Sequence, residues 1–188
     1  MKPVLLFVLL FSSQAFSKLT VNQPSFQFTG YKFTEKAPVS GTFKDIQWTY
    51  EKESNSIEEL LLSGSIIIDS FTVSSGDKIR DNNLLEGIFK VWGSRQISAK
   101  VISIDKKTNK LSIELKVGEN IKLIDMNYSI KGTTLAIAGK IDLLELGFSK
   151  AYAKLSKLCK AFHIGVDGIN KTWSEVGLKL TANINPSN

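Results

Sequence analysis

The residues of this chain that could support catalysis or bind a metal ion are few, and most stand near its C-terminal end. Cys159, His163 and Asp167 are four residues apart, so a continuous helix would align them on one face. Such a set could form a thiolate–imidazole pair or contribute ligands to a metal site. However, Gly165 and Gly168 are expected to end the helix before Asp167, and a zinc site takes three or four ligands. The sequence therefore favours a buried thiol on an apolar helix face, beside a histidine at the helix C-terminus.

Two pairs of adjacent charged residues offer no catalytic geometry either. Glu58 and Glu59 are expected in a strand, where neighbours point to opposite faces and cannot share an acid–base task. Arg80 and Asp81 stand near the start of an expected helix, where the favoured interpretation is that charge-assisted hydrogen bonds pin the helix to the rest of the fold. The chain also carries no G-x-G-x-x-G, P-loop or C-x-x-C motif. We therefore expect no enzymatic activity, no cofactor and no metal site.

Length and composition predict one exported globular domain. The chain has 188 residues, of which 43% are hydrophobic, and its mean hydropathy is near zero, as in globular and not in disordered proteins. Residues 1–17 have the pattern of a signal peptide, with Lys2 ahead of a short apolar run and Ala15-Phe16-Ser17 as a cleavage site. We therefore expect a periplasmic protein in which residues 18–188 form a single domain.

The charge of the chain argues against nucleic-acid recognition. The net charge is +6, but the basic residues are 22 lysines and only two arginines, Arg80 and Arg95. Proteins that bind nucleic acids favour arginine for bidentate contacts with phosphate and guanine. The favoured interpretation of the lysines is an ordinary solvated surface. A weak contact with an anionic membrane surface remains as the functional alternative. The single cysteine excludes an intramolecular disulfide, and the protein is expected to be a monomer or a homodimer.

Alternation of apolar and polar residues dominates the chain, and this pattern is typical of strands with one buried face. It is clearest over 111–117, 135–143 and 176–184. Short turns join four consecutive runs between 96 and 144 into an expected antiparallel meander. Further expected strands bring the total to eight, and they lie near 24–33, 42–51, 57–73 and 174–185.

Two stretches have helical spacing instead, Asp77–Trp92 and Ser149–Phe162. The second would bury one face made of Tyr152, Leu155, Cys159 and Phe162. We therefore predict an all-β fold of eight antiparallel strands with one or two short helices. Such a sheet must close into a barrel or fold into a two-layer sandwich, and periodicity alone does not decide between them.

Three short motifs follow one another along the chain. Gly41-Thr42-Phe43 follows the first expected strand, Arg80-Asp81 with Leu84 stands at a helix start, and Leu144–Phe148 ends a strand. In this order they resemble the YceI-like family of exported bacterial proteins, over roughly residues 20–185. The chain departs from the family after Phe148, where a lysine-rich helical stretch replaces a short loop, and at Glu145-Leu146, where the family prefers Asp-Phe.

The resemblance implies a lipocalin-like barrel whose elongated cavity holds a polyisoprenoid or a similar long-chain amphiphile. It favours a periplasmic, non-enzymatic carrier or scavenger of a long apolar ligand, such as an isoprenoid, a quinone or a fatty acyl compound. The alternative is an envelope interaction protein whose barrel is filled with side chains. From the strand phase and the resemblance together, the residues expected to line the cavity are Phe26, Phe28, Phe43, Trp48, Ile66, Ile68, Phe71, Phe89, Trp92, Ile113, Leu115, Ile137, Ile141, Leu178 and Leu180.

Overall fold

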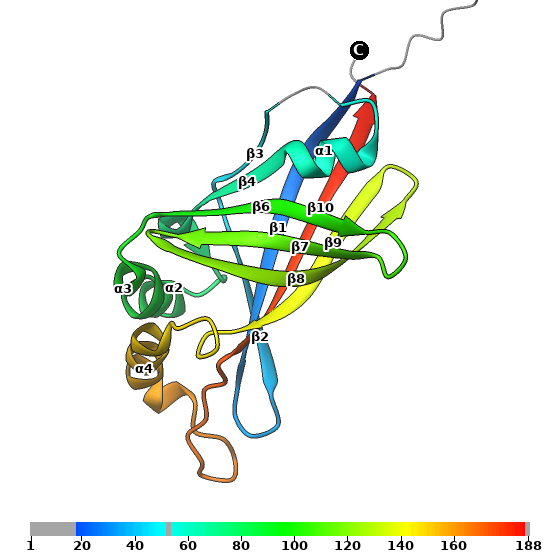
Figure 1. The fold of residues 1–188 in the computed structure, drawn as a ribbon. Helices are drawn as coiled ribbons and strands as arrows, with labels where there is room; N and C mark the ends of the chain where they lie inside the picture. Colours follow the sequence, from blue (N-terminus) through cyan, green and yellow to red (C-terminus); the bar gives the residue numbers. More distant parts are fainter. Residues whose placement is uncertain (1–17, 52–53, 187–188) are drawn as a thin grey trace, which may run out of the picture.

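The computed structural model describes residues 18–51 and 54–186, and the expected signal peptide, residues 1–17, lies outside this part of the chain. The described residues form one antiparallel sheet that curls around an apolar interior, together with a few short helices (Figure 1). The predicted all-β, lipocalin-like fold class is confirmed. No helix within the described ranges is long and apolar enough to cross a membrane.

The sheet contains ten strands within the described residues. They are β1 (Leu19–Lys32), β2 (Ala37–Phe43), β3 (Ile46–Tyr50), β4 (Gly64–Asp69), β5 (Val73–Ser74), β6 (Gln96–Asp105), β7 (Lys110–Val117), β8 (Asn120–Lys131), β9 (Thr134–Asp142) and β10 (Glu175–Pro186). Their order across the sheet is β3-β4-β6-β7-β8-β9-β10-β1-β2-β5, so the expected four-strand meander is present as β6 to β9. β1 pairs along its length with β10, and Leu19 lies opposite Pro186.

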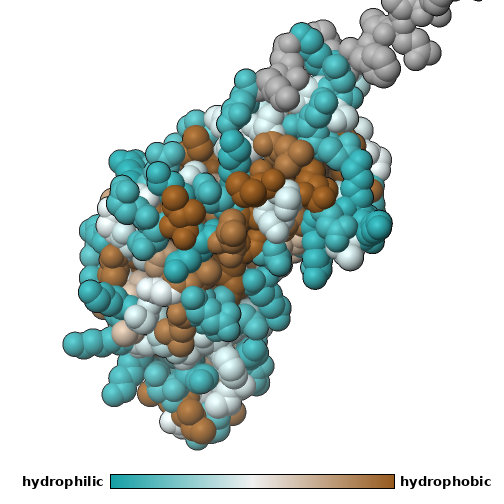
Figure 2. Space-filling model, in the orientation of Figure 1, coloured by the Kyte–Doolittle hydropathy of each residue, from teal (hydrophilic) through white to brown (hydrophobic). Residues whose placement is uncertain are grey.

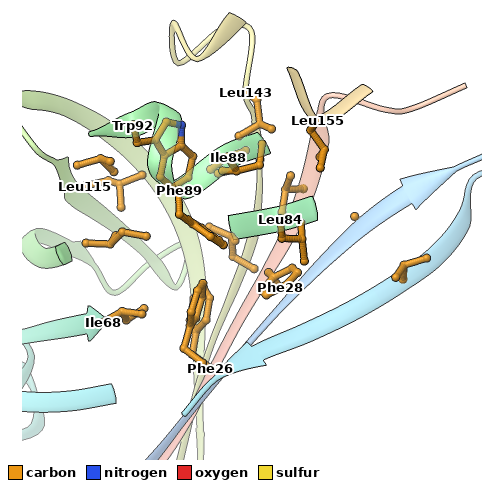
Figure 3. Close-up of a pocket in the computed structure, with 18 of the residues that line it drawn as sticks. Phe26, Phe28, Ile68, Leu84, Ile88, Phe89, Trp92, Leu115, Leu143 and Leu155 are labelled. Atoms are coloured by element: carbon orange, nitrogen blue, oxygen red, sulfur yellow. The ribbon is translucent and has the colours of Figure 1, made fainter. Parts of the chain in front are cut away.

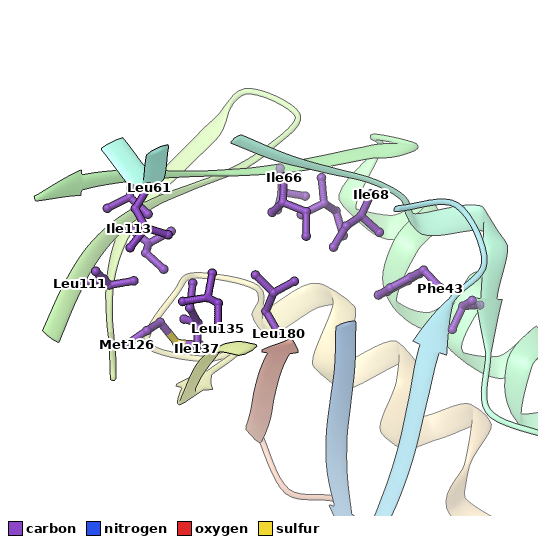
Figure 4. Close-up of a cluster of buried hydrophobic side chains, with 14 of the residues drawn as sticks. Phe43, Leu61, Ile66, Ile68, Leu111, Ile113, Met126, Leu135, Ile137 and Leu180 are labelled. Atoms are coloured by element: carbon purple, nitrogen blue, oxygen red, sulfur yellow. The ribbon is translucent and has the colours of Figure 1, made fainter. Parts of the chain in front are cut away.

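The alternation of side chains decides which face of the sheet turns inward. On β7, Leu111 is 0% and Val117 1% exposed, whereas Lys116 between the inward residues is exposed. Leu135 on β9 is also 0% exposed. These side chains belong to one continuous apolar cluster that extends along the sheet as far as Phe43 (Figure 4). Polar side chains cover much of the outer surface, interrupted by apolar groups (Figure 2).

The expected number of eight strands is too low, because two of the expected strands are broken. The run 42–51 divides at Lys44-Asp45, where β2 ends and β3 begins. The run 57–73 divides into the helix α1 (Ile57–Ser63), β4, a 3₁₀ turn (Ser70–Thr72) and the start of β5.

Helix α1 stands where a strand was expected. Ser56 caps it, since the Ser56 Oγ accepts a hydrogen bond from the Glu59 backbone N–H at 3.2 Å. Leu60 and Leu61 are adjacent and both 0% exposed, which a strand with one buried face cannot achieve. Glu58 and Glu59 therefore lie in the first turn of a helix, where the helix dipole favours acidic residues.

The first expected helix is present as one continuous segment from Lys78 to Trp92. It consists of α2 (Lys78–Leu84), a π-helical turn (Leu85–Phe89) and α3 (Lys90–Trp92). Asp77 caps its start by accepting a hydrogen bond from the Arg80 N–H at 2.8 Å. Gly93 ends it in the left-handed conformation, with φ of 70°.

Arg80 and Asp81 both bind Ser75, which follows β5 directly. The Arg80 guanidinium donates to the Ser75 carbonyl and hydroxyl oxygens, each at 2.8 Å. The Asp81 carboxylate accepts from the Ser75 backbone N–H at 2.7 Å. Since β5 pairs with β2, these charge-assisted bonds fix the helix to the sheet, and the structural interpretation of this pair is confirmed.

The second expected helix is α4 (Ser149–Leu158), followed by a 3₁₀ turn (Lys160–Phe162). It packs on the π-helical turn so closely that a Cβ added to Gly87 would lie 2.9 Å from the Leu155 Cα. Only glycine fits this position without moving the helix.

The buried face of α4 is shorter than expected. Ala151 and Cys159 are buried, and Tyr152 and Leu155 are half-buried. Phe162 is 54% exposed, so its expected burial is wrong. The chain changes from α-helical to 3₁₀ geometry after α4, which shifts the angular phase of the side chains that follow.

The inward face of the sheet yields a stability prediction. The change Leu135→Ala removes a fully buried side chain, and we expect it to lower the free energy of unfolding by about 2–5 kcal/mol. On the neighbouring strand Leu123 is 70% exposed, so Leu123→Ala should change it by less than about 0.5 kcal/mol. Urea unfolding followed by circular dichroism measures both, and equal losses in the two variants would contradict the assignment of faces.

Candidate functional site

An elongated cavity of about 380 Å³ lies between the curled sheet and the helices. This volume is within the range of roughly 300–1,000 Å³ that is common for small-molecule sites. One wall is formed by inward side chains of the sheet, such as Ile68 and Leu115, and the opposite wall by helical residues such as Leu84 and Ile88 (Figure 3). Because inward residues alternate along every strand, the walls are almost entirely apolar.

A chain of five aromatic rings runs along one side of the cavity into the helices. Phe43 contacts Phe28 and Phe89 with ring-centroid distances of 5.6 and 5.4 Å, and Phe89 contacts Trp92 at 5.4 Å. Trp92 in turn contacts Phe148 at 4.8 Å. These tilted and edge-to-face contacts connect β1 and β2 to the helical segment, so they hold the wall in one shape.

Most of the residues expected to line the cavity do so. The structure brings together Phe26, Phe28, Phe43, Trp48, Ile66, Ile68, Phe89, Trp92, Ile113, Leu115, Ile137, Ile141, Leu178 and Leu180. Their contact with a ligand stays a prediction.

Phe71 is the exception, and its expected position in the cavity is wrong. It belongs to the 3₁₀ turn after β4 and is 39% exposed. The Asp69 carboxylate accepts a hydrogen bond from the Phe71 backbone N–H at 3.0 Å and closes this turn. Ile66 and Ile68 are buried, so alternation along β4 already places position 71 on the outer face, where the Arg95 guanidinium lies 5.7 Å from the Phe71 ring centroid.

Several lining residues were missed by the sequence analysis for two different reasons. Ile97, Ala99 and Val101 alternate on β6 in the pattern that identified β7, and the same pattern could have found them. The polar lining residues come from four separate segments, so no local pattern joins them. They include Tyr31, Lys32, Asp77, Arg80, Asn83, His163 and Thr172.

The polar end of the cavity is organised around Thr172. Its hydroxyl oxygen lies 2.6 Å from the His163 Nδ1, and its carbonyl oxygen accepts a hydrogen bond from the Tyr152 hydroxyl at 2.8 Å. Asn83 donates from Nδ2 to the Cys159 Sγ at 3.8 Å. Lys32 adds positive charge here, and the cavity is therefore amphiphilic, with a long apolar part and one polar end.

Cys159, His163 and Asp167 do not form a shared site. Asp167 is exposed, and its carboxylate accepts a hydrogen bond from the Thr34 hydroxyl at 2.6 Å. Burial raises the pKa of the Cys159 thiol, and burial together with the charge of Lys32 lowers the pKa of the His163 imidazole. A thiolate–imidazolium pair needs the opposite shifts, so this environment favours the neutral forms of both groups.

Two indole N–H groups in the cavity wall lack a partner. The Nε1 atoms of Trp48 and Trp92 are buried and make no hydrogen bond to any residue of the described ranges. A buried donor without a partner costs free energy, so the two indoles are a local cost to stability within the cavity wall.

The burial of Cys159 leads to a prediction about thiol reactivity. Because burial raises its pKa, we expect the native protein to react slowly with an aromatic disulfide reagent and quickly in denaturant. Val166 is fully exposed at 107%, so a Val166→Cys variant carrying Cys159→Ser is the positive control and should react quickly when folded. Fast labelling of native Cys159 would contradict the structure.

His163 is the only histidine of the chain, so its titration can be followed as a single imidazole resonance. We expect a pKa below the ordinary value of about 6.5, chiefly because of burial, and a partial rise in Lys32→Gln. Since the unfolded chain binds this proton more readily, the stability that neutral His163 confers is present above about pH 6.5 and declines as the pH falls. Proton NMR between about pH 8 and 5 measures this pKa. A free histidine has a pKa of about 6.5, and a value at or above it would refute the assigned environment of His163.

Comparison with known proteins gives matches to solved structures only, since no family model and no curated protein matches the sequence. A polyisoprenoid-binding domain from Saccharophagus degradans, implicated in plant cell wall breakdown, is 12% identical, with a TM-score of 0.63 over 92% of this chain and 99% of that one. BcnA from Burkholderia cenocepacia is 13% identical, with a TM-score of 0.56 over 86% and 96% of the two chains.

The YceI protein of Campylobacter jejuni is 15% identical, with a TM-score of 0.54 over 81% of this chain and 86% of that one. These similarities extend over most of each chain, and at this level of identity they concern the fold. The expected resemblance is confirmed at the level of the fold, and the chain has the YceI-like fold.

Proposed function

We propose that the protein binds a long-chain apolar or amphiphilic molecule in its cavity and serves as a non-enzymatic periplasmic carrier or scavenger. The observation that carries this proposal is the largely apolar cavity of about 380 Å³. Burial of a methylene group contributes about 0.8 kcal/mol, so a chain of about ten carbons gains about 8 kcal/mol before ordering costs. The polyisoprenoid-binding domain among the structural neighbours supports the same class of ligand.

The cavity also suggests how such a ligand is oriented. The inward residues of the sheet, such as Ile113 and Leu178, would contact the apolar tail. The polar end, with Lys32 and His163, would meet the head group. Isoprenoids, quinones and fatty acyl compounds all fit this arrangement.

The presence of the cavity argues against the alternative, an interaction protein with a filled barrel, because close packing of side chains would have removed the space. The environment of Cys159 and His163 supports a role without covalent chemistry. The periplasmic location rests on the signal pattern of residues 1–17.

The direct test is organic extraction of natively purified protein followed by mass spectrometry. We expect a long-chain lipid in near-stoichiometric amount in the extract, and its absence from protein unfolded before purification. If the native protein carries no such compound and also fails to bind fluorescent fatty acid and isoprenoid probes, the proposal is wrong.

A bulky residue placed in the cavity should block uptake. Gly30 lies on the inward face of β1, and a Cβ there meets no atom within 4 Å, so Gly30→Trp directs an indole into open space. We expect this variant to bind a fluorescent fatty acid at least about ten-fold more weakly, which corresponds to about 1.4 kcal/mol. Gln27→Trp on the exposed face of the same strand should bind normally. Both should retain the β-sheet circular-dichroism signal, and equal binding by the two would contradict an interior site.

A further inference from the structure

The segment after α4 forms a β-hairpin with an unusual composition. We call residues 162–171 the apolar hairpin. Its two arms are joined by an isolated bridge between Ile164 and Asn170 and by a hydrogen bond from the Lys171 N–H to the His163 carbonyl oxygen at 3.0 Å. The turn is closed by a bond from the Gly165 N–H to the Ile169 carbonyl oxygen at 3.0 Å. In Figure 1 the hairpin is the orange loop at the lower tip of the molecule, beside the turn between β1 and β2.

The hairpin exposes large apolar side chains to solvent. Val166 at its turn is 107% exposed, and Phe162, Ile164 and Ile169 are 54%, 50% and 52% exposed. In Figure 2 a small brown group is visible at this lower tip among hydrophilic residues. Exposed apolar side chains are common singly, but a group of four on ten residues marks an interaction site.

Side-chain hydrogen bonds fix the hairpin against the loop between β1 and β2. The Asp167 carboxylate accepts from the Thr34 hydroxyl at 2.6 Å, which ties the turn to the loop between β1 and β2. The Trp173 indole N–H donates to the Phe33 carbonyl oxygen at 2.7 Å, next to the base of the hairpin. The apolar side chains are therefore presented by a fixed scaffold and cannot collapse onto the core.

Positive charge surrounds the apolar tip. Lys157 and Lys160 lie exposed on the segment that enters the hairpin, and Lys171 lies at its base. The acidic residues nearby are Glu35 and Asp167, and the carboxylate of Asp167 already accepts hydrogen bonds from Thr34 and from the Ile169 backbone. The chain as a whole has a net charge of +6, so its long-range attraction is also toward anionic surfaces.

The hairpin adjoins the polar end of the cavity. Phe162 and His163 at its start, and Thr172 and Trp173 just after it, all line the cavity. A surface that binds the exposed side of the hairpin would therefore lie next to this end of the cavity.

We propose that the apolar hairpin is a membrane-docking element that inserts its tip among the head groups of an anionic phospholipid surface. Exposed apolar side chains combined with flanking lysines are the two features that give reversible interfacial binding. Four side chains offer a small area compared with the roughly 800 Å² per partner of a stable protein interface, which disfavours a protein as occupant. Docking itself does not depend on the cavity, but its use for ligand exchange rests on the proposed carrier function.

Vesicle co-sedimentation of designed variants tests this docking. A tip variant, Val166→Ser with Ile169→Ser, removes apolar surface, and a charge variant, Lys157→Gln with Lys160→Gln, removes flanking charge. The matched control is Ile121→Ser with Leu123→Ser on the outer face of β8, where both side chains are exposed at 53% and 70%. The vesicles are phosphatidylcholine with phosphatidylglycerol, or phosphatidylcholine alone, at low and near-physiological salt.

We expect the wild type and the control to bind the anionic vesicles at low salt and to be released as the salt rises. The tip and charge variants should each partition at least about ten-fold more weakly. Equal binding of the tip variant and the wild type would overturn the proposal, as would equal binding to neutral vesicles. A dimer in solution that the tip variant dissociates, without vesicle binding, would assign the hairpin to a second copy and would also overturn it.

An environment-sensitive dye gives a second readout, which reports insertion directly and does not depend on a variant that binds vesicles more weakly. A dye on Val166→Cys in the Cys159→Ser background should shift its emission to the blue with anionic vesicles. A dye on Lys131→Cys in the same background, at the exposed end of β8 far from the hairpin, should not. No shift at either site would refute docking through the tip. Organic extraction of the same protein reports on the cavity separately, so a failure of docking and a failure of ligand binding are distinguishable.

Discussion

The structure depends on one constraint, which is that a single sheet with an apolar inner face must shield that face from water. The sheet meets the constraint by curling on itself, and the ring contacts from Phe43 through Phe89 to Trp92 attach the helical segment across the remaining gap. Because the curl is wider than the inward side chains can fill, shielding is achieved without complete packing. The cavity is thus a product of the same geometry that stabilises the fold.

The sequence predicted those parts of the fold that repeat a local pattern. The meander β6–β9 and most of the cavity wall follow from alternation along strands, where one residue fixes the face of the next. Helix α1 was missed because Leu60, Leu62 and Gly64 are spaced two residues apart, which would also place them on one face of a strand. The cap formed by Ser56, with Glu59 three residues later, was the signal that distinguishes the helix.

Other features could not have been predicted from local patterns. The polar end of the cavity joins Lys32, Asn83, His163 and Thr172, which only the folded chain brings together. Phe71 is different, because alternation from the inward Ile66 and Ile68 already places position 71 on the outer face, and the strand phase could have excluded it from the cavity. The choice of a barrel over a sandwich came from the motifs, and the structural neighbours at 12–15% identity show that this fold tolerates almost complete replacement of its side chains.

The pairing of β1 with β10 has a consequence for the order of folding. Leu19 lies opposite Pro186, so two neighbouring interior strands of the sheet come from opposite ends of the described part of the chain. Contacts of such long sequence separation require closure of a loop that contains nearly the whole domain, and they form late and slowly. The meander can form early from its short turns, but the interior has no enclosing wall until the last strand is in place. A chain truncated before β10 would therefore leave β9 with an unpaired edge beside the apolar face of the meander, which is an aggregation-prone surface.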